Sequence, residues 1–332
     1  MKNKIFSKRG VIILVTLVAI AGAFSIVFHH NLLADPQEEI IKKVIACLMI
    51  IAGYTAFLKM YDKIAVLPLE LWQNRRLIWK LSKNDFKTRY AGSYMGMVWA
   101  LVQPVVMILM YWFVFEIGFS AKAEIMGNGI TAPYVLYLTA GIVPWMYFSE
   151  ALSSGTTALL EYNYLVKKVV FKISILPIIK IISATFIHAF FVLFMLILYA
   201  CHGWFPDLYM LQIIYYSFCM FIFVLGISYT TCAIAVFFRD ITQIISIFLQ
   251  VGMWATPILW NMSTMIPERY QIFFKINPMY YIVNGYRSAL IEKSWFWTDF
   301  YSTAYFWIVT AILFGVGGLI FKRLKVHFAD VL

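Results

Sequence analysis

The residues that could do chemistry in this sequence are ionisable side chains inside long apolar stretches. Glu150 and His188 lie within two such stretches, and Glu116 lies near the end of a third. A charge in hydrocarbon is costly, so each residue is a candidate for proton transfer or substrate binding. A structural role is the alternative, because a buried histidine often bonds to a neighbouring helix and Glu150 is expected near the inner interface. We favour the structural role for both.

Signatures of catalysis and nucleotide binding are absent from the sequence. It contains no Gly-Lys pair and therefore no P-loop, and it contains neither HExxH nor GxSxG. The four cysteines have no CxxC pair and no metal-ligand spacing. A membrane-embedded transferase would need carboxylates or histidines clustered at one membrane face, and none appears. We expect no enzyme activity, metal or cofactor in this chain.

Aromatic side chains form a second group of candidates. Tyr111 and Phe115 are four residues apart, so they share one face of a helix, and Trp99 precedes them in the same stretch. Aromatic rings near the ends of a membrane span commonly anchor it at the interface. Rings in a row would also suit sugars, whose apolar C–H faces can stack on them. The sequence leaves both roles open.

The composition places these residues in an integral membrane protein. Of the 332 residues, 63% are hydrophobic and 13% charged, whereas soluble domains are about half apolar and a quarter charged. The net charge of +11 comes from basic residues between apolar stretches, which favours membrane lipids over nucleic acid as the partner. We predict eight spans of about 20 residues, the shortest being the penultimate one. They lie near 11–28, 42–60, 95–118, 133–153, 174–201, 209–237, 243–260 and 302–321.

Basic loops predict the orientation. Most lysines and arginines fall in 1–10, 59–94, 154–180, 238–242 and 322–332, which are all on one side of the membrane if the spans alternate. The positive-inside rule then places both termini in the cytoplasm, in a multi-pass protein of the cytoplasmic membrane. The first stretch is longer than the apolar region of a signal peptide, so we expect a retained anchor.

Three regions follow from this pattern. Residues 1–62 hold two N-terminal spans, and residues 95–332 hold six spans with short outer helices at about 262–292. Between them, residues 63–94 carry a stripe of basic residues at spacings of four, three and four, which predicts an amphipathic helix at the headgroups. That helix could be a lipid-bound spacer or a guide for an anionic lipid-linked substrate, and both roles stay open.

A series of different short motifs occurs between about Leu67 and the C-terminus. They are Arg89-Tyr90-Ala-Gly-Ser93 with Gly96-Met-Val-Trp99 and Pro104; Gly141-Ile-Val-Pro-Trp145 with Phe148-Ser-Glu150; Tyr164-Leu-Val-Lys167-Lys168 with Phe171 and Pro177; Phe238-Arg239-Asp240; Thr256-Pro257-Ile258; Asn277-Pro278 with Tyr286-Arg287; and Phe328-Ala329-Asp330-Val331-Leu332. Together they resemble the permeases of ABC exporters that move lipid-linked polysaccharides, including O-antigen, capsule, rhamnan and teichoic acid.

This resemblance implies an all-α polytopic fold, a six-helix type-2 ABC exporter core preceded here by two extra transmembrane helices. It implies a homodimer around a channel and two copies of a separate ATP-binding cassette subunit, which holds ATP and Mg²⁺. The cargo would be an undecaprenyl-type lipid-linked polysaccharide or teichoic acid. An ABC exporter of a small lipid or drug, or a gradient-driven lipid-linked sugar flippase, is the alternative. The scarcity of ionisable residues at mid-membrane disfavours the flippase.

The resemblance also implies roles for individual residues. The channel would be lined by Trp99, Tyr111, Phe115, Trp254 and Trp260. The entrance helix would present Arg76, Lys80, Lys83, Lys87, Arg89 and Tyr90. Coupling to the ATPase would involve Glu161, Lys167, Lys168, Phe171, Arg239 and Asp240. The outer gate would involve Asn277, Pro278 and Arg287. The two extra spans are interpreted as peripheral packing or as a docking surface.

Overall fold

The computed structural model describes residues 8–28, most of 40–58, and residues 66–89, 96–118, 124–125, 130–167 and 171–332. The chain divides into two compact units, Met1–Gln73 and Asn74–Leu332. The first contains α1 (Lys8–Phe28) and α3 (Val66–Gln73). The hydroxyl groups of Thr16 in α1 and Tyr54 lie 2.8 Å apart. This hydrogen bond joins α1 to the shorter apolar helix Ala46–Thr55, so the two N-terminal apolar segments pack on each other.

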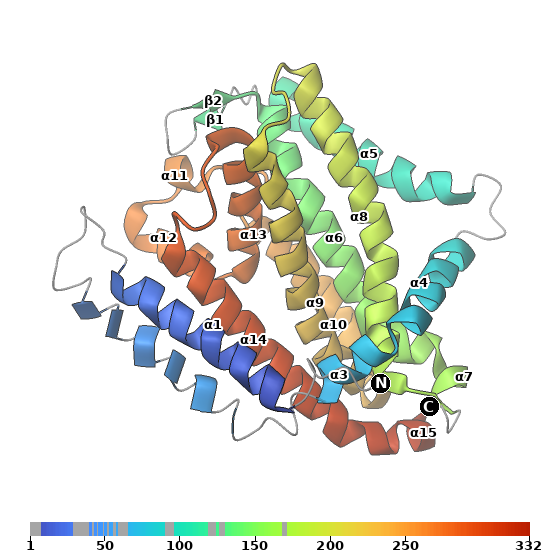
Figure 1. The fold of residues 1–332 in the computed structure, drawn as a ribbon. Helices are drawn as coiled ribbons and strands as arrows, with labels where there is room; N and C mark the ends of the chain where they lie inside the picture. Colours follow the sequence, from blue (N-terminus) through green and yellow to red (C-terminus); the bar gives the residue numbers. More distant parts are fainter. Residues whose placement is uncertain are drawn as a thin grey trace. The chain divides into compact units, whose positions relative to one another are not determined.

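The second unit is a bundle of apolar helices (Figure 1). Across the described residues of the whole chain, five helices are long and apolar enough to cross a membrane and three apolar helices are shorter. They coincide with the eight predicted spans, which confirms the all-α polytopic fold. The helices of the bundle are α5 (Trp99–Trp112, continued by the π-helical turn Phe113–Gly118), α6 (Tyr134–Glu161), α8 (Leu176–Cys201), α9 (Gln212–Phe237), α10 (Ile241–Ala255) and α14 (Phe300–Leu324).

Two predicted span boundaries are wrong. Helix α6 continues past residue 153 to Glu161 although its last turns are rich in serine and threonine. Those hydroxyls bond within the helix and to its neighbour: Thr156 donates to the carbonyl of Leu152 at 2.8 Å and lies 2.8 Å from the hydroxyl of Thr231. Helix α10 stops at Ala255 rather than at residue 260, because Pro257 has no N–H to continue the helical hydrogen bonds.

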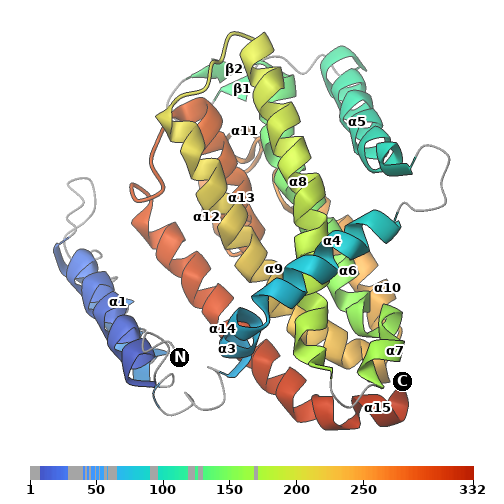
Figure 2. The same cartoon turned by 45° about the vertical axis from the view of Figure 1, so that its right-hand side comes forward.

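Helix α6 forms the centre of the bundle. It packs between α8 and α9, and α14 packs against the other side of α9 (Figures 1 and 2). The α9–α14 crossing is close because glycines face each other. A Cβ on Gly317 would lie 2.4 Å from the carbonyl oxygen of Gly226. Small residues let helix backbones approach in this way in membrane proteins, where van der Waals packing drives association.

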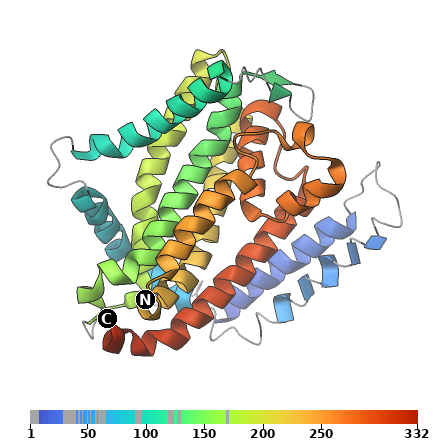
Figure 3. The same ribbon diagram turned by 180° about the vertical axis from the view of Figure 1, so that it is seen from behind.

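Because successive long helices run in opposite directions, their connections lie at two distinct ends of the bundle. We call one the α7 end: it carries α7 (Asn163–Val166), α15 (Phe328–Val331) and the turn between α9 and α10 (Figure 3). We call the other the α12 end: it carries α11 (Met262–Met265), α12 (Glu268–Lys275), α13 (Pro278–Arg287) and the antiparallel pair β1 (Glu124–Ile125) and β2 (Thr131–Ala132). The Asn277 side chain caps α13 by accepting from the N–H of Met279 at 3.0 Å, as the sequence predicts.

Helix α4 (Arg75–Arg89) crosses α8 near the α7 end (Figure 2). The amphipathic segment expected across 63–94 is interrupted at Asn74, where α3 ends and α4 begins. Asparagine has low helix propensity because its side chain competes for backbone hydrogen bonds. The basic stripe of Arg76, Lys80, Lys83 and Lys87 is exposed on α4.

Candidate functional site

A buried ion pair joins α4 to α8 at the α7 end. Lys180 donates from Nζ to Oδ1 of Asp85 at 2.6 Å, and the two side chains are only 8% and 5% exposed. Tyr162, just after α6, donates its hydroxyl to the same carboxylate oxygen at 2.5 Å. Lys180 also pairs with Glu161 Oε2 at 2.6 Å, and its ammonium group lies 4.9 Å from the ring centre of Tyr162. We call these four side chains the α4–α6–α8 junction.

The electrostatics of this junction favour the charged form of Asp85. Burial alone would raise the pKa of the Asp85 carboxyl, but hydrogen bonds from Lys180 and Tyr162, and the positive charge of Lys180, hold it below its ordinary value. Burial, followed by the hydrogen bond to the Asp85 carboxylate, raises the pKa of Tyr162. Asp85 is therefore an anion at neutral pH, and Tyr162 is a neutral donor.

Sequence reasoning missed Asp85 and Lys180. The signal was present for Lys180, which stands alone among apolar residues three positions after Pro177, at the start of a span. For Asp85 the signal was weak, because a carboxylate within a basic amphipathic segment is expected to be solvated. Only the crossing of α4 over α8 brings together side chains that are 95 positions apart.

The C-terminal end of α4 contacts α6 through a second polar cluster. The guanidinium of Arg89 donates to Oε1 of Glu150, and its Nη2 donates to the hydroxyl of Ser154 at 3.0 Å. Ser154 in turn donates to Glu150 at 3.0 Å. Two residues singled out from sequence for separate reasons, Arg89 for a predicted entrance helix and Glu150 for its place in an apolar stretch, thus form an ion pair. Tyr90 lies outside the described residues.

The residues expected to couple to an ATPase lie at the α7 end. Glu161 ends α6 and pairs with Lys180, whereas Lys167 is the first residue after α7. Arg239 and Asp240 form the exposed turn between α9 and α10. Phe171 is partly exposed just before α8, and Lys168 lies outside the described residues. These residues come from two separate loops of the same end of the bundle (Figures 1 and 3).

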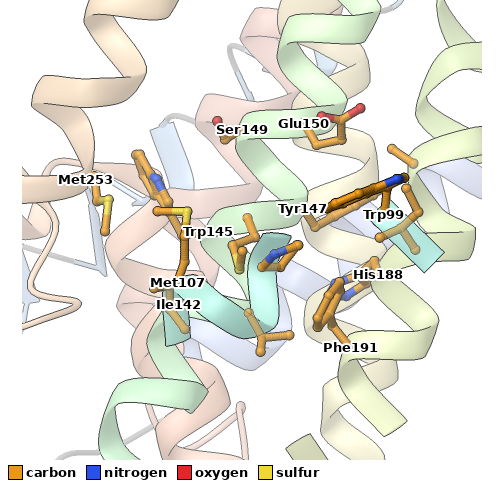
Figure 4. A pocket seen from close by; sticks show the side chains of 15 residues that line it. Trp99, Met107, Ile142, Trp145, Tyr147, Ser149, Glu150, His188, Phe191 and Met253 are labelled. Atoms are coloured by element: carbon orange, nitrogen blue, oxygen red, sulfur yellow. The ribbon is translucent and has the colours of Figure 1, made fainter. Parts of the chain in front are cut away.

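A cavity of about 390 Å³ opens between α5, α6, α8 and α10 (Figure 4). Trp99, the first of the aromatic residues expected in a channel, lines it together with Trp145, Tyr147, Glu150 and His188. Its walls are mainly apolar and aromatic, with Glu150 as a charged group. Such a cavity is suited to an amphiphilic molecule rather than to an ion.

His188 bridges helices within this cavity wall. Its Nε2 lies 3.1 Å from both the hydroxyl of Ser217 in α9 and that of Tyr286 in α13. Its ring also stacks on Tyr147 of α6, with centroids 4.5 Å apart. His188 therefore contacts three neighbouring helices, as the structural role favoured from the sequence requires.

A second, apolar pocket of about 450 Å³ contains three of the remaining predicted aromatics. Phe115, Trp254 and Trp260 line it, and the ring of Phe274 lies 5.3 Å from that of Trp260. Tyr111 donates a weak hydrogen bond to the sulfur of Met253, 3.9 Å away, and Met253 lines the first cavity. The structure thus brings Phe115, which follows α5, into one pocket with Trp254 of α10 and Trp260.

At the α12 end, Arg287 holds the turn that follows α10. Its Nη1 donates to the carbonyl of Pro257 at 2.6 Å and its Nη2 to that of Ile258 at 2.8 Å. The guanidinium lies 3.5 Å from the ring centre of Tyr137. Asn277 donates from Nδ2 to the hydroxyl of Thr256 at 2.8 Å. Pro278 begins α13, so all three predicted gate residues lie in or beside one fixed turn.

Comparisons with known proteins agree with this architecture. The model of one protein family, described as ABC-2 type transporter, matches residues 76–291. The O-antigen export system permease protein RfbA of Myxococcus xanthus is 27% identical over 224 residues, covering 67% of this chain and 83% of the relative. Its namesake from Klebsiella pneumoniae is 25% identical over 254 residues, covering 76% of this chain and 93% of the relative.

Proposed function

Because the chain belongs to the ABC-2 type transporter family, we propose that it is the membrane-spanning permease subunit of an ABC exporter for a lipid-linked polysaccharide. Its relatives are permeases of O-antigen export systems, and the cargo proposed here is a glycan on an undecaprenyl-type lipid. The permease lies in the cytoplasmic membrane, with the α7 end and both termini on the cytoplasmic side.

The observation that carries this proposal is the way α4 is fixed. Its exposed basic stripe is suited to the anionic headgroup of a lipid-linked glycan arriving along the membrane surface. The opposite face is held to α8 by the Asp85–Lys180 pair and to α6 by Arg89. A basic helix that is anchored in this way presents its charges in one direction, beside the cavity lined by Trp99 and Glu150. A lipid-bound spacer would need no such anchoring.

The aromatic rings of α5 and α10 form the proposed path for the sugars. Trp99 and Trp254 are 51% and 60% exposed in the single chain. Rings bind the apolar faces of many sugars weakly, which allows a polymer to slide. We infer that two copies of this chain face each other across these helices, so that the rings line a shared channel.

The α7 end is the proposed docking site for two copies of an ATP-binding cassette subunit, which bind ATP and Mg²⁺. Asn163 and Tyr164 of α7 and the Arg239–Asp240 turn are exposed there. Glu161 connects the start of the α7 loop to Lys180 and hence to α4. Movement of the loop would therefore reach the entrance helix through contiguous polar contacts.

Charge reversal tests the docking site. The Lys167→Glu substitution is expected to lower polysaccharide export several-fold and to reduce its coupling to ATP hydrolysis, because the partner surface would meet the opposite charge. Export is measured by surface glycan staining, and coupling by ATPase activity of the purified complex. Arg269→Glu, at the α12 end, is the matched control and should leave both unchanged. Normal export by Lys167→Glu would refute the docking assignment.

Ring removal tests the path. Replacing Tyr111 and Trp254 together by alanine should lower export while the complex still assembles, because the sugar-stacking surfaces are lost. Phe205→Ala removes a ring that is 70% exposed outside the proposed path and serves as the control. Export at the wild-type rate after the double substitution would mean that these rings only anchor the helices in the membrane.

A further inference from the structure

A polar pocket of about 240 Å³ lies at the α12 end, apart from the two apolar cavities. It is enclosed by α6, the turn after α10, α12 and α13; Figure 1 shows these short helices gathered at that end. Its walls combine two tyrosine rings, Tyr137 and Tyr280, with the amides of Asn261, Gln271 and Asn284. Lys275, Arg287 and Glu292 add charges of both signs.

One wall of this polar pocket is rigid. Arg287 is only 3% exposed and bonds to two carbonyls of the Pro257–Ile258 turn, while Tyr137 under it donates to the carbonyl of Trp260 at 2.9 Å. The Nε–H of Arg287 finds no hydrogen-bond partner in the described part of the chain. A buried donor is costly unless it is satisfied, so this N–H is available to a hydroxyl group that enters the pocket.

Other groups in the pocket are also open to a ligand. Gln271 uses its Nε2 to bond to the carbonyl of Ile266 at 3.1 Å, which leaves its oxygen as an acceptor. Within the described residues, the side chains of Tyr280, Asn284 and Lys275 make no hydrogen bond. Burial raises the pKa of Tyr280 to about 12, so its phenol stays neutral and can both donate and accept.

This set of groups matches a sugar better than a lipid or an anion. Amides, a phenol and a carboxylate can satisfy hydroxyls that both donate and accept, and a tyrosine ring can contact the C–H face of a pyranose. A fatty acyl chain would leave these polar groups unsatisfied. An anion would be repelled by the Glu292 carboxylate in the same lining, and the two Nη groups of Arg287 already donate to carbonyls.

We propose that the polar pocket at the α12 end binds one sugar unit of the exported glycan on the side where the polymer is released. This inference rests on the proposed function for its cargo and its sidedness. The volume is smaller than that of usual ligand cavities of about 300–1,000 Å³, so it fits a single unit and not a long segment. Holding one unit there would oppose backward sliding of the chain between ATPase cycles.

The test uses the complete complex of this chain with its ATPase, reconstituted in lipid nanodiscs. The probe is short oligosaccharide prepared from the host's own envelope polysaccharide after removal of its lipid, and binding is followed by saturation-transfer NMR and titration. Asn284→Ala and Tyr280→Phe should each weaken binding about fivefold, the effect of one hydrogen bond. Both groups lack internal hydrogen bonds, so the fold should be retained, which thermal unfolding checks.

The matched control is Tyr270→Phe, which removes a hydroxyl from an exposed tyrosine of α12 that does not line the pocket; it should bind the oligosaccharide as the wild type does. A complex that exports glycan but binds oligosaccharide equally well after both pocket substitutions would overturn the inference and leave the proposed function standing. A chain that exports nothing, yet loses oligosaccharide binding on Asn284→Ala, would keep the pocket and remove the export function.

Discussion

Two buried cations fix opposite ends of the bundle, and they are stabilised in different ways. Lys180 pairs with the carboxylates of Asp85 and Glu161 at the α7 end. Arg287 donates to two backbone carbonyls and lies on a tyrosine ring at the α12 end. The first contact joins separate helices by charge, so it can break and re-form when α4 or the loop after α6 moves. The second holds the Pro257–Ile258 turn with a planar guanidinium fork. We infer a movable junction at one end and a fixed turn at the other.

The largest effect is expected from removing one partner of the charged junction. Lys180→Met leaves Asp85 buried without its cation, which should lower the free energy of unfolding by about 3–5 kcal/mol. Equilibrium unfolding in mixed micelles measures this loss. The double variant with Asp85→Leu should regain most of it, because two apolar side chains can replace a buried ion pair. No recovery in the double variant would mean that Lys180 acts mainly through Glu161 or Tyr162.

The next effect tests the fork at the other end. Arg287→Lys keeps the positive charge but cannot reach both carbonyls, so one buried acceptor loses its partner. The expected loss is about 2–3 kcal/mol, in the range of a hydrogen bond to a charged group. The same unfolding assay applies, with Arg269→Lys at an exposed position as control. A loss equal to that of the control would show that charge alone holds this turn.

A smaller effect is expected in the pH dependence of stability at the Asp85–Lys180 pair. Because the pKa of Asp85 is held below its ordinary value of 3.8 in the fold, the unfolded chain takes up the proton first as the pH falls. The stabilisation is complete above that value and is lost below it, as the pH falls through the folded-state pKa. The melting temperature of the wild type should therefore fall more steeply between pH 5 and pH 3 than that of Asp85→Asn. Parallel curves for the two proteins would contradict this expectation.

The smallest effect is expected at the Arg89–Glu150 contact. The Arg89 and Glu150 side chains are 23% and 43% exposed, and partly solvated ion pairs contribute about 0–1 kcal/mol. Glu150→Gln should therefore change the free energy of unfolding by less than about 1 kcal/mol. Ser154→Ala removes the neighbouring hydroxyl as a control. A much larger loss would show that this contact, and not the Asp85–Lys180 pair, is the main anchor of α4.

Much of the fold could be predicted from hydrophobicity and loop chemistry. Every predicted span corresponds to an apolar helix, and the Asn277–Pro278 cap begins α13 as expected. The errors are confined to the predicted ends of the spans that correspond to α6 and α10. Serine and threonine in the last turns of α6 were interpreted as loop residues, but they bond along the helix and to α9. Chain-local signals cannot reveal a neighbouring helix that satisfies those hydroxyls.

The candidate sites depended more strongly on tertiary structure. Aromatic residues in and just after α5 and α10 could be selected from sequence because of their type and their place in the predicted spans, and three of them share a pocket. Asp85 and, apart from Arg287, the residues of the polar pocket at the α12 end could not be selected. Their side chains are ordinary in their own segments and acquire a role only from their neighbours.

The sequence by itself determined that this is a polytopic helical membrane protein, because the free energy of burying about 20 apolar residues in lipid is decided locally, span by span. It also determined the exposed basic stripe of α4, because helical periodicity places residues three and four apart on one face. The tertiary structure alone decided which charges are paired. Asp85 meets Lys180 because α4 crosses α8, and Arg287 meets the Pro257 carbonyl because α13 packs against α6 beside that turn. The energy of a buried charge depends on the neighbour it meets.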